Sequence, residues 1–190
     1  ISQSGFSDCE FITDNSYIGT ASPDYFVKLK QVHGIGFSCC HFTNNHHEDF
    51  YGSGIYSFNS GYDVKGKCVS GDSPCSNWEN GNFTNLKRGI YATSGGNLYF
   101  PEIDRITFTE NFRGVYFSGM ENGSVTNCNF TTGPTSGYDW PYGIYLDHST
   151  GYKIENDSLY QGRNVGYGIV VNNSGGDPNE IYRNYLEGLI

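Results

Sequence analysis

The sequence predicts an all-β protein, a right-handed parallel β-helix, because two short motifs alternate along the chain and because its composition favours strands. One motif is a glycine, a β-branched residue and in most copies a tyrosine. Self-similarity with a period of tens of residues is typical of stacked solenoids. The 26 glycines, 16 tyrosines and 13 phenylalanines, against 16% charged residues, favour short strands and tight turns over helices. Copies of this first motif begin at Gly54, Gly89, Gly114, Gly143 and Gly168.

The second motif predicts where each coil of the solenoid begins. It begins with an apolar residue and two variable residues. The fourth residue is most often small and polar or a cysteine, and one variable residue and a second apolar residue follow it. Its copies begin 22 to 39 residues apart, so we expect two strands per copy and loops of variable length. Seven copies predict about seven coils, which at about 4.8 Å each make a rod of roughly 34 Å. The copies begin at Phe6, Phe37, Val64, Ile103, Val125, Ile154 and Ile181.

Stacked coils place equivalent residues above one another, which explains the residues found at the repeated positions. Asparagines expected in the turns, Asn127, Asn156 and Asn184, tolerate left-handed backbone and can form hydrogen-bonded ladders between coils. Glycine at the start of each first-motif strand is expected to let the chain turn a corner. The inward residues expected to stack are Ile144, Ile154 and Leu159 on Val115, Val125 and Phe130.

Residues 1–190 are predicted to form one domain, because no linker or change in composition divides them. We expect neither end to be capped, since Gly188-Leu189-Ile190 resembles the start of a further strand. Solenoids need caps that protect their terminal strands, so we expect the chain to be a segment of a longer polypeptide. Barrels and sandwiches are disfavoured, because no Asn-Gly or Asp-Gly turn recurs at regular places.

The charge of the chain limits its partners. With a net charge of −9 and a pI near 4.8, nucleic acids and anionic membranes are poor partners. Strongly anionic polysaccharides are also disfavoured unless a local basic cleft or bound calcium overrides the field. Turn aspartates could supply calcium ligands, although no calcium-binding repeat or EF-hand loop is present. No stretch approaches the roughly 18 apolar residues of a membrane span.

The six cysteines are expected to have different roles. Cys68 and Cys75 frame a short loop, which favours a local disulfide and an oxidising, extracellular setting. Cys9, Cys40 and Cys128 occupy the fourth place of the second motif, where we expect small buried thiols. Because Cys9 and Cys40 fall in successive copies, stacking at about 4.8 Å would also permit a disulfide between them. A metal site is not expected, because no Cys-x-x-Cys pair is present.

The two motifs together cover nearly the whole chain, which resembles the parallel β-helix repeats of the pectin lyase-like superfamily. Its Asn-, Gly- and Tyr-rich repeats are similar to those of large secreted surface proteins of Bacteroidota-type bacteria. The resemblance implies the β-helix fold and a secreted or cell-surface location. Because such repeats occur in polysaccharide lyases, glycoside hydrolases, phage tailspikes and adhesins, it leaves the chemistry open.

The loops that precede the first-motif strands are expected to emerge along one edge of the rod, the usual binding face of a solenoid. Residues 131–142 carry aromatic side chains on which a sugar ring can stack, and residues 70–88 can add Trp78. The alternative for Trp140 is that it packs over the flank of the rod. The candidate ligand-binding residues are Trp78, Tyr138, Asp139, Trp140 and Tyr142.

Two groups of residues could supply an acid and a base if the protein is an enzyme. One group lies in the loop of residues 43–53, for which a solvated polar loop is the alternative. The other directly follows a first-motif strand and pairs a carboxylate with a histidine, as in lyase and epimerase sites of the resembled fold. The signatures of polygalacturonases and alginate epimerases are absent. These candidates are His46, His47, Glu48 and Asp49 in the loop, and Asp147 and His148 after the strand.

The missing signatures, the acidic surface and the aromatic loops favour a secreted or cell-surface module, structural, adhesive or glycan-binding, without catalysis. Its expected partners are glycans or other cell-surface components and the rest of a larger polypeptide. The alternatives are a carbohydrate-active enzyme, either a polysaccharide lyase or a glycoside hydrolase, and a purely architectural rod. A lyase needs a cation beside a uronate, but we expect the repeat arginines to pair with the acidic surface. These are Arg105, Arg113, Arg163 and Arg183.

Overall fold

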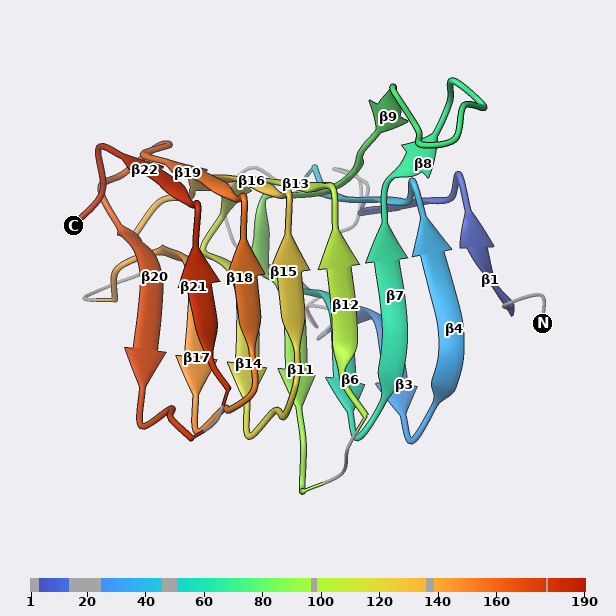
Figure 1. The fold of residues 1–190 in the computed structure, drawn as a ribbon. Coiled ribbons are helices and arrows are strands. Elements are labelled where there is room, and N and C mark those ends of the chain that lie inside the picture. The colour runs from blue at the N-terminus through green and yellow to red at the C-terminus, as the bar shows by residue number, and fades with distance from the viewer. Residues whose placement is uncertain (1–3, 14–24, 46–50, 97–98, 136–138, 177) are drawn as a thin grey trace.

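The computed structural model describes residues 4–13, 25–45, 51–96, 99–135, 139–176 and 178–190. These residues form strands and turns that wind as a right-handed parallel β-solenoid of about six turns (Figure 1). Three sheets make the walls of the rod, and the side chains between them fill its interior. Among the described residues, no helix is long and apolar enough to cross a membrane.

Two of the walls are seven-stranded sheets to which successive coils contribute one strand each. Sheet A, in the foreground of Figure 1, contains β1 (Ser4–Ser7), β4 (His33–Ser38), β7 (Gly61–Lys65), β12 (Pro101–Asp104), β15 (Ser124–Thr126), β18 (Lys153–Glu155) and β21 (Glu180–Tyr182). Sheet B contains β2 (Glu10–Thr13), β5 (His41–Asn44), β10 (Gly81–Thr84), β13 (Ile106–Asn111), β16 (Asn129–Thr132), β19 (Ser158–Tyr160) and β22 (Tyr185–Glu187).

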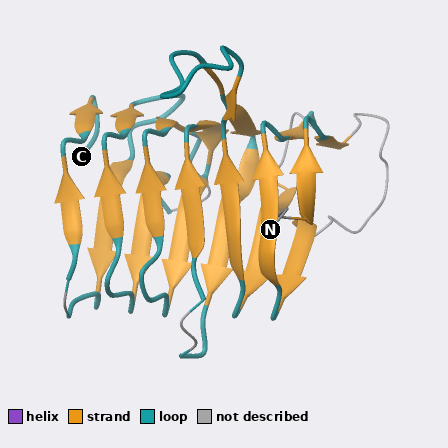
Figure 2. Cartoon of the chain, turned by 45° about the vertical axis from the view of Figure 1, so that its right-hand side comes forward, coloured by secondary structure: helices purple, strands orange, loops and turns teal. Residues whose placement is uncertain are grey.

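The third wall has one strand fewer, so the chain completes about six turns rather than the seven coils expected. The seventh copy of the second motif supplies strands to sheets A and B only. Sheet C contains β3 (Tyr25–Lys30), β6 (Tyr51–Phe58), β11 (Leu86–Thr93), β14 (Arg113–Ser118), β17 (Tyr142–Asp147) and β20 (Tyr167–Asn172). A two-stranded antiparallel hairpin, β8 (Lys67–Cys68) and β9 (Trp78–Glu79), projects from the edge between sheets A and B (Figure 2).

The register confirms the stacking expected from the motifs. Val125 lies between Ile103 and Ile154 in sheet A. Phe130 lies beneath Leu159 in sheet B, and Ile144 lies above Val115 in sheet C. All seven apolar residues that begin the second motif therefore form one column of sheet A, at successive strands from β1 to β21.

A column of phenylalanine rings forms the centre of the core and explains the glycines of the first motif. The rings of Phe83 and Phe108 are stacked 5.2 Å apart, and Phe108 and Phe130 follow at 4.6 Å. A Cβ atom on Gly89 would lie 2.7 Å from the Phe108 ring, and one on Gly114 would lie 2.7 Å from the Phe130 ring. The glycines therefore make room for the rings, and no side chain would fit at these positions, as expected; they do so inside β11 and β14, however, rather than at a corner between strands.

Six of the seven passages from sheet A to sheet B are tight turns around one residue with left-handed backbone, and the passage from β7 to β10 instead carries the β8–β9 hairpin. Asn127 (φ 55°) and Asn156 (φ 57°) occupy this position as expected. In the last described coil the left-handed residue is Arg183 (φ 56°), and Asn184 instead follows it with an inward side chain. The amide of Asn184 accepts a hydrogen bond from Asp157 N at 2.8 Å and donates one to Ile154 O at 3.0 Å.

Two strands occur where the motifs do not predict them. Strand β3 lacks the Gly-Ile-Tyr sequence, but its Val27 is in register with Ile55 of β6. Strand β10 lies inside the segment expected to be one long loop, and its Phe83 is in register with Phe42 of β5. The hairpin of β8 and β9 is inserted between β7 and β10. The apolar residue that ends the second motif in the other coils is therefore displaced along the chain to Phe83, where the spacing of the motif does not predict it.

Candidate functional site

The outer face of sheet C carries two adjacent columns of side chains, in which arginines and tyrosines stand side by side. In one column, Arg88 of β11 is followed in successive strands by Arg113, Tyr142 and Tyr167. In the other, Tyr91 and Tyr116 are stacked 4.9 Å apart, and Tyr145 meets Tyr116 edge-on at 5.1 Å. Tyr56 continues this second column toward the N-terminal end.

A groove of about 350 Å³ opens over these columns, a size within the range of small-molecule binding sites. Its wall is completed by the end of the loop between β16 and β17, which supplies Asp139 and Trp140. That end is held on sheet C because Tyr167 N donates a hydrogen bond to Pro141 O at 2.9 Å. The residues that line the groove are Arg113, Tyr116, Asp139, Trp140, Tyr142, Tyr145, Tyr167 and Val170.

Arg113 lies at the centre of the groove. Its guanidinium carbon is 5.1 Å from the Tyr142 ring and 5.8 Å from the Tyr116 ring, so the cation rests on aromatic faces. Arg113 Nη2 is 3.9 Å from Asp139 Oδ2, a loose ion pair with an exposed carboxylate. Trp140, with 46% of its surface exposed, adds a further aromatic side chain to the wall.

Burial raises the pKa of both tyrosines that contact Arg113. For Tyr142 the loss of hydration outweighs the attraction of Arg113 for a phenolate, and the pKa lies well above its ordinary value. For Tyr116 burial again dominates, and the negative charge of Asp147 adds to the increase in pKa. Both side chains therefore remain neutral hydroxyl groups that can donate and accept hydrogen bonds.

The structure brings together three of the five residues predicted to bind a ligand: Asp139, Trp140 and Tyr142 all line the groove. Tyr138 lies outside the described residues. Trp78 is elsewhere, because β9 belongs to the hairpin at the edge between sheets A and B, while the groove lies on sheet C. Its ring packs against Arg105, whose guanidinium carbon is 4.1 Å away. Trp78 therefore does not join the aromatic groove.

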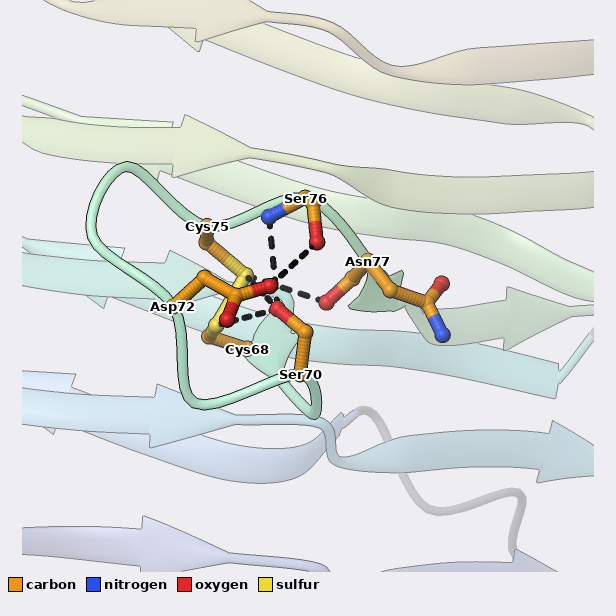
Figure 3. The surroundings of a disulfide bond; sticks show 6 residues. All are labelled: Cys68, Ser70, Asp72, Cys75, Ser76 and Asn77. Atoms are coloured by element: carbon orange, nitrogen blue, oxygen red, sulfur yellow. Dashed lines mark hydrogen bonds between the residues drawn. A yellow bond between two sulfur atoms is a disulfide. The ribbon is translucent and has the colours of Figure 1, made fainter.

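The hairpin that carries Trp78 is closed by the disulfide expected between Cys68 and Cys75 (Figure 3). Their Cα atoms are 5.9 Å apart. Within the enclosed loop, the Ser76 hydroxyl donates a hydrogen bond to Asp72 at 2.6 Å, and Ser76 N donates one to the Ser70 hydroxyl at 3.3 Å. These contacts are local, and the hairpin is fixed to the rod by the Trp78–Arg105 contact and by Lys67 Nζ, which donates a hydrogen bond to Asp8 Oδ2 at 2.7 Å.

The histidine-rich candidates His46, His47, Glu48 and Asp49 lie outside the described residues. The second candidate pair is described: His148 Nδ1 is 2.8 Å from Asp147 Oδ1, and Asn172 Nδ2 donates to the same oxygen at 2.9 Å. His148 has positive φ (49°) and occupies the turn out of sheet C, where earlier coils have Gln31 and Asn59. The pair therefore lies at the end of β17, and its residues are not among those that line the groove.

The other cysteines are free thiols, so the disulfide considered between Cys9 and Cys40 does not form. The two residues are stacked in neighbouring coils, but each thiol turns to a backbone carbonyl. Cys9 Sγ donates to Ser7 O at 3.4 Å, and Cys40 Sγ donates to Phe6 O at 3.5 Å. Cys40 and Cys128 are buried as expected, whereas Cys9 in the first described coil is half-exposed.

Asp157 occupies the same column as Cys128 and is the one buried acid among the described residues. Its Oδ1 accepts a hydrogen bond from Cys128 N at 2.7 Å. Its Oδ2 is buried without a hydrogen-bond partner in the described part of the chain. Burial raises the pKa of Asp157 to about 8, so the carboxyl group holds its proton at neutral pH.

The acidic surface pairs with three of the four repeat arginines, as expected. Arg105 contacts Asp104, Arg113 contacts Asp139 and Arg183 contacts Glu155, with the last pair at 3.5 Å. Within the described segments, no group of three or more His, Cys, Asp or Glu side chains is placed to hold a metal ion.

Sequence reasoning missed most of the groove. Tyr116, Tyr145 and Tyr167 come from three different coils, and the register of sheet C brings them together. The available signal was the third residue of the first motif, which is tyrosine in four successive copies and points outward. The chain matches no known family model, and it has no significant match among curated proteins.

Proposed function

We propose that the protein is a secreted or cell-surface β-solenoid module that binds a glycan in the groove on sheet C. Sugar rings present flat faces of C–H groups, and proteins bind these faces with aromatic rings and the hydroxyl edges with polar side chains. The groove has both components within one cavity of about 350 Å³. The disulfide of the projecting hairpin suits the oxidising environment outside a cell.

The observation that carries the proposal is that the exposed Trp140 lines one groove together with tyrosines from three successive strands of sheet C. Large exposed aromatic side chains on a soluble surface are often part of an interaction site. Trp140 lines the same groove as the half-buried rings of Tyr116 and Tyr145. We expect a pyranose ring bound in this groove to pack its apolar face against these aromatic side chains.

Binding without catalysis is favoured over a lyase or hydrolase. A tyrosine that acts as a general base needs a lowered pKa, but burial raises the pKa of Tyr116 and of Tyr142. Among the described residues, Asp139 is the one carboxylate that lines the groove, and it is exposed and lies beside Arg113. A hydrolase of the two-carboxylate kind would need a second carboxylate roughly 5 to 9.5 Å from the first.

The test is a glycan-array and polysaccharide-depletion screen, with reducing ends and the ultraviolet absorbance of unsaturated products measured in the same wells. Trp140→Ala should abolish binding to any glycan that the native protein retains. The matched control is Trp78→Ala, which removes the other tryptophan of the chain from the hairpin. The Trp78→Phe variant leaves Trp140 as the sole tryptophan, so its fluorescence reports occupancy of the groove directly.

Three outcomes separate the candidate functions. Binding that requires Trp140 and creates no new reducing ends or absorbance supports the glycan-binding module. Product formation would refute a purely binding role and direct attention to Asp147 and His148. Silence in every well, or binding that survives Trp140→Ala, would refute the groove as a glycan site and leave an architectural rod as the explanation of the fold.

A further inference from the structure

The two arginines beside the groove lie next to one another with little negative charge around them. Arg88 and Arg113 occupy the same position on neighbouring strands, since Ile90 is in register with Val115. Neighbouring strands lie about 4.8 Å apart, so two like charges are held close together. Burial lowers the pKa of Arg88, and the positive charge of Arg113 lowers it further.

Aromatic rings, rather than carboxylates, hold these two cations in place. The guanidinium of Arg88 lies 4.5 Å from the Tyr91 ring, and that of Arg113 lies over Tyr142 and Tyr116. Among the described residues Arg88 forms no ion pair, and Arg113 has only the 3.9 Å contact with the exposed Asp139. The Nε atoms of Arg88 and Arg113 are buried, and neither has a hydrogen-bond partner among those residues.

This arrangement is unusual for a chain whose net charge is −9. Acidic side chains are abundant enough to neutralise both arginines, yet the side chains that contact their guanidinium groups among the described residues are aromatic, apart from the loose contact of Arg113 with Asp139. Arginine is the side chain best suited to bind an oxyanion through two parallel hydrogen bonds, and stacking on an aromatic ring fixes the plane of those donors. Two like-charged guanidinium groups on neighbouring strands, each resting on an aromatic ring, are what binding of an oxyanion at this place would need.

We propose that the ligand of the groove is an acidic glycan, and that its carboxylate or sulfate group binds between Arg88 and Arg113. This inference rests on the proposed glycan-binding function. The sugar ring would lie against Trp140 and the tyrosine column, while the oxyanion points along the arginine column toward β11. An anionic group bound there offsets the repulsion between the two guanidinium groups. This local attraction can outweigh the repulsion that the acidic surface as a whole exerts on an anionic ligand.

The experiment compares charged and uncharged forms of the same oligosaccharide. One arm uses a uronic acid tetrasaccharide and its methyl ester, and the other uses a sulfated tetrasaccharide and its desulfated form. Affinity is measured by Trp140 fluorescence in the Trp78→Phe background. We expect the charged form of at least one pair to bind roughly 10- to 100-fold more tightly than the uncharged form, as hydrogen bonds to charged groups do. The arm that shows the difference identifies the anionic group.

Arg88→Gln tests the receptor against a control of identical net charge. It should remove the preference for the charged form, so that the charged and uncharged forms bind with equal affinity. Arg183→Gln changes the net charge equally at an exposed turn, so it should leave both affinities intact. Arg88→Lys keeps the charge but loses the planar pair of donors, and we expect an intermediate affinity. If Arg88→Gln does not fold, this lysine variant still tests the proposal.

The outcomes also distinguish this inference from the proposed function beneath it. Equal binding of charged and uncharged forms through Trp140 would overturn the oxyanion receptor and leave glycan binding in place. Equal losses of affinity in Arg88→Gln and Arg183→Gln would also overturn it, because a long-range field would then explain the preference. Failure of all four oligosaccharides and of the wider glycan screen would refute both ideas.

Discussion

Replacing Asp157 by asparagine should stabilise the protein at neutral pH. The carboxyl group is almost wholly buried, and its Oδ1 accepts the hydrogen bond from Cys128 N. One coil further on, Asn184 holds the equivalent place, where its Nδ2 donates to the backbone carbonyl of Ile154. The equivalent carbonyl for residue 157 is that of Val125, because Val125 and Ile154 are in register. Only a protonated Asp157, or an asparagine, has a donor to direct toward it.

The size of the effect follows from the pKa. Burial raises the pKa of Asp157 from 3.8 to about 8 in the folded protein. The folded state therefore binds the proton more tightly, and stability falls as the pH rises through the window from about 4 to about 8. Each pH unit within that window costs about 1.4 kcal/mol, so about 4 kcal/mol is lost by pH 7. An asparagine does not titrate and avoids this loss.

Urea unfolding of Asp157→Asn and of the native protein at several pH values measures the difference directly. The two proteins should have similar free energies of unfolding near pH 4, and the variant should gain steadily up to about pH 8. Asp139→Asn, the same change on an exposed side chain, is the control and should show no such trend. A difference that is independent of pH, or a variant less stable at every pH, would refute the argument that Asp157 is a buried neutral acid.

Three further predictions concern the frame around the groove. Phe108→Ala removes a ring stacked on both sides and should cost about 3–5 kcal/mol of unfolding free energy in urea, and a smaller loss would mean that the ring column is not tightly packed. Gly114→Ala places a Cβ 2.5 Å from a backbone oxygen of the next coil and should cost about 1–3 kcal/mol, whereas Gly175→Ala, with no atom within 4 Å, should be neutral. Replacing Cys68 and Cys75 by serine should speed amide hydrogen exchange in the hairpin by about 10- to 100-fold and leave the global melting temperature unchanged. A large drop in that temperature would show that the hairpin supports the rod.

The repeated core was predictable because each coil repeats the same local pattern. An apolar residue such as Val125 or Ile154 marks its own column, and the intervals between such residues place the strands of sheet A. Strand β10 was not predictable, because the disulfide-closed hairpin lengthens one interval and separates its Phe83 from the start of the motif. Strand β3 was missed because packing of Val27 on Ile55, rather than a glycine motif, fixes its register.

The groove was only half predictable, because it combines a local segment with a long-range arrangement. Asp139, Trp140 and Tyr142 are near neighbours in the chain, so their aromatic and acidic character could be recognised together. Arg88 and Arg113 are 25 residues apart, but each directly precedes the glycine of a first-motif copy, so the repeat already places them in one column, and the register of β11 with β14 confirms it. The sequence does not show that residues 139–142 fold over the same face of sheet C.

The direction of the hydrogen bonds between coils gives the rod a distinctive response to mechanical force. The strands run across the long axis, and β1 and β22 lie at opposite ends of it, so the bonds that join successive coils point along the axis (Figure 1). Tension applied along the rod would load these bonds layer by layer and detach one coil at a time. Each detached coil of 22 to 39 residues would release roughly 75–135 Å of extended chain. A rod built in this way would yield in steps and absorb a sudden load without breaking the covalent chain.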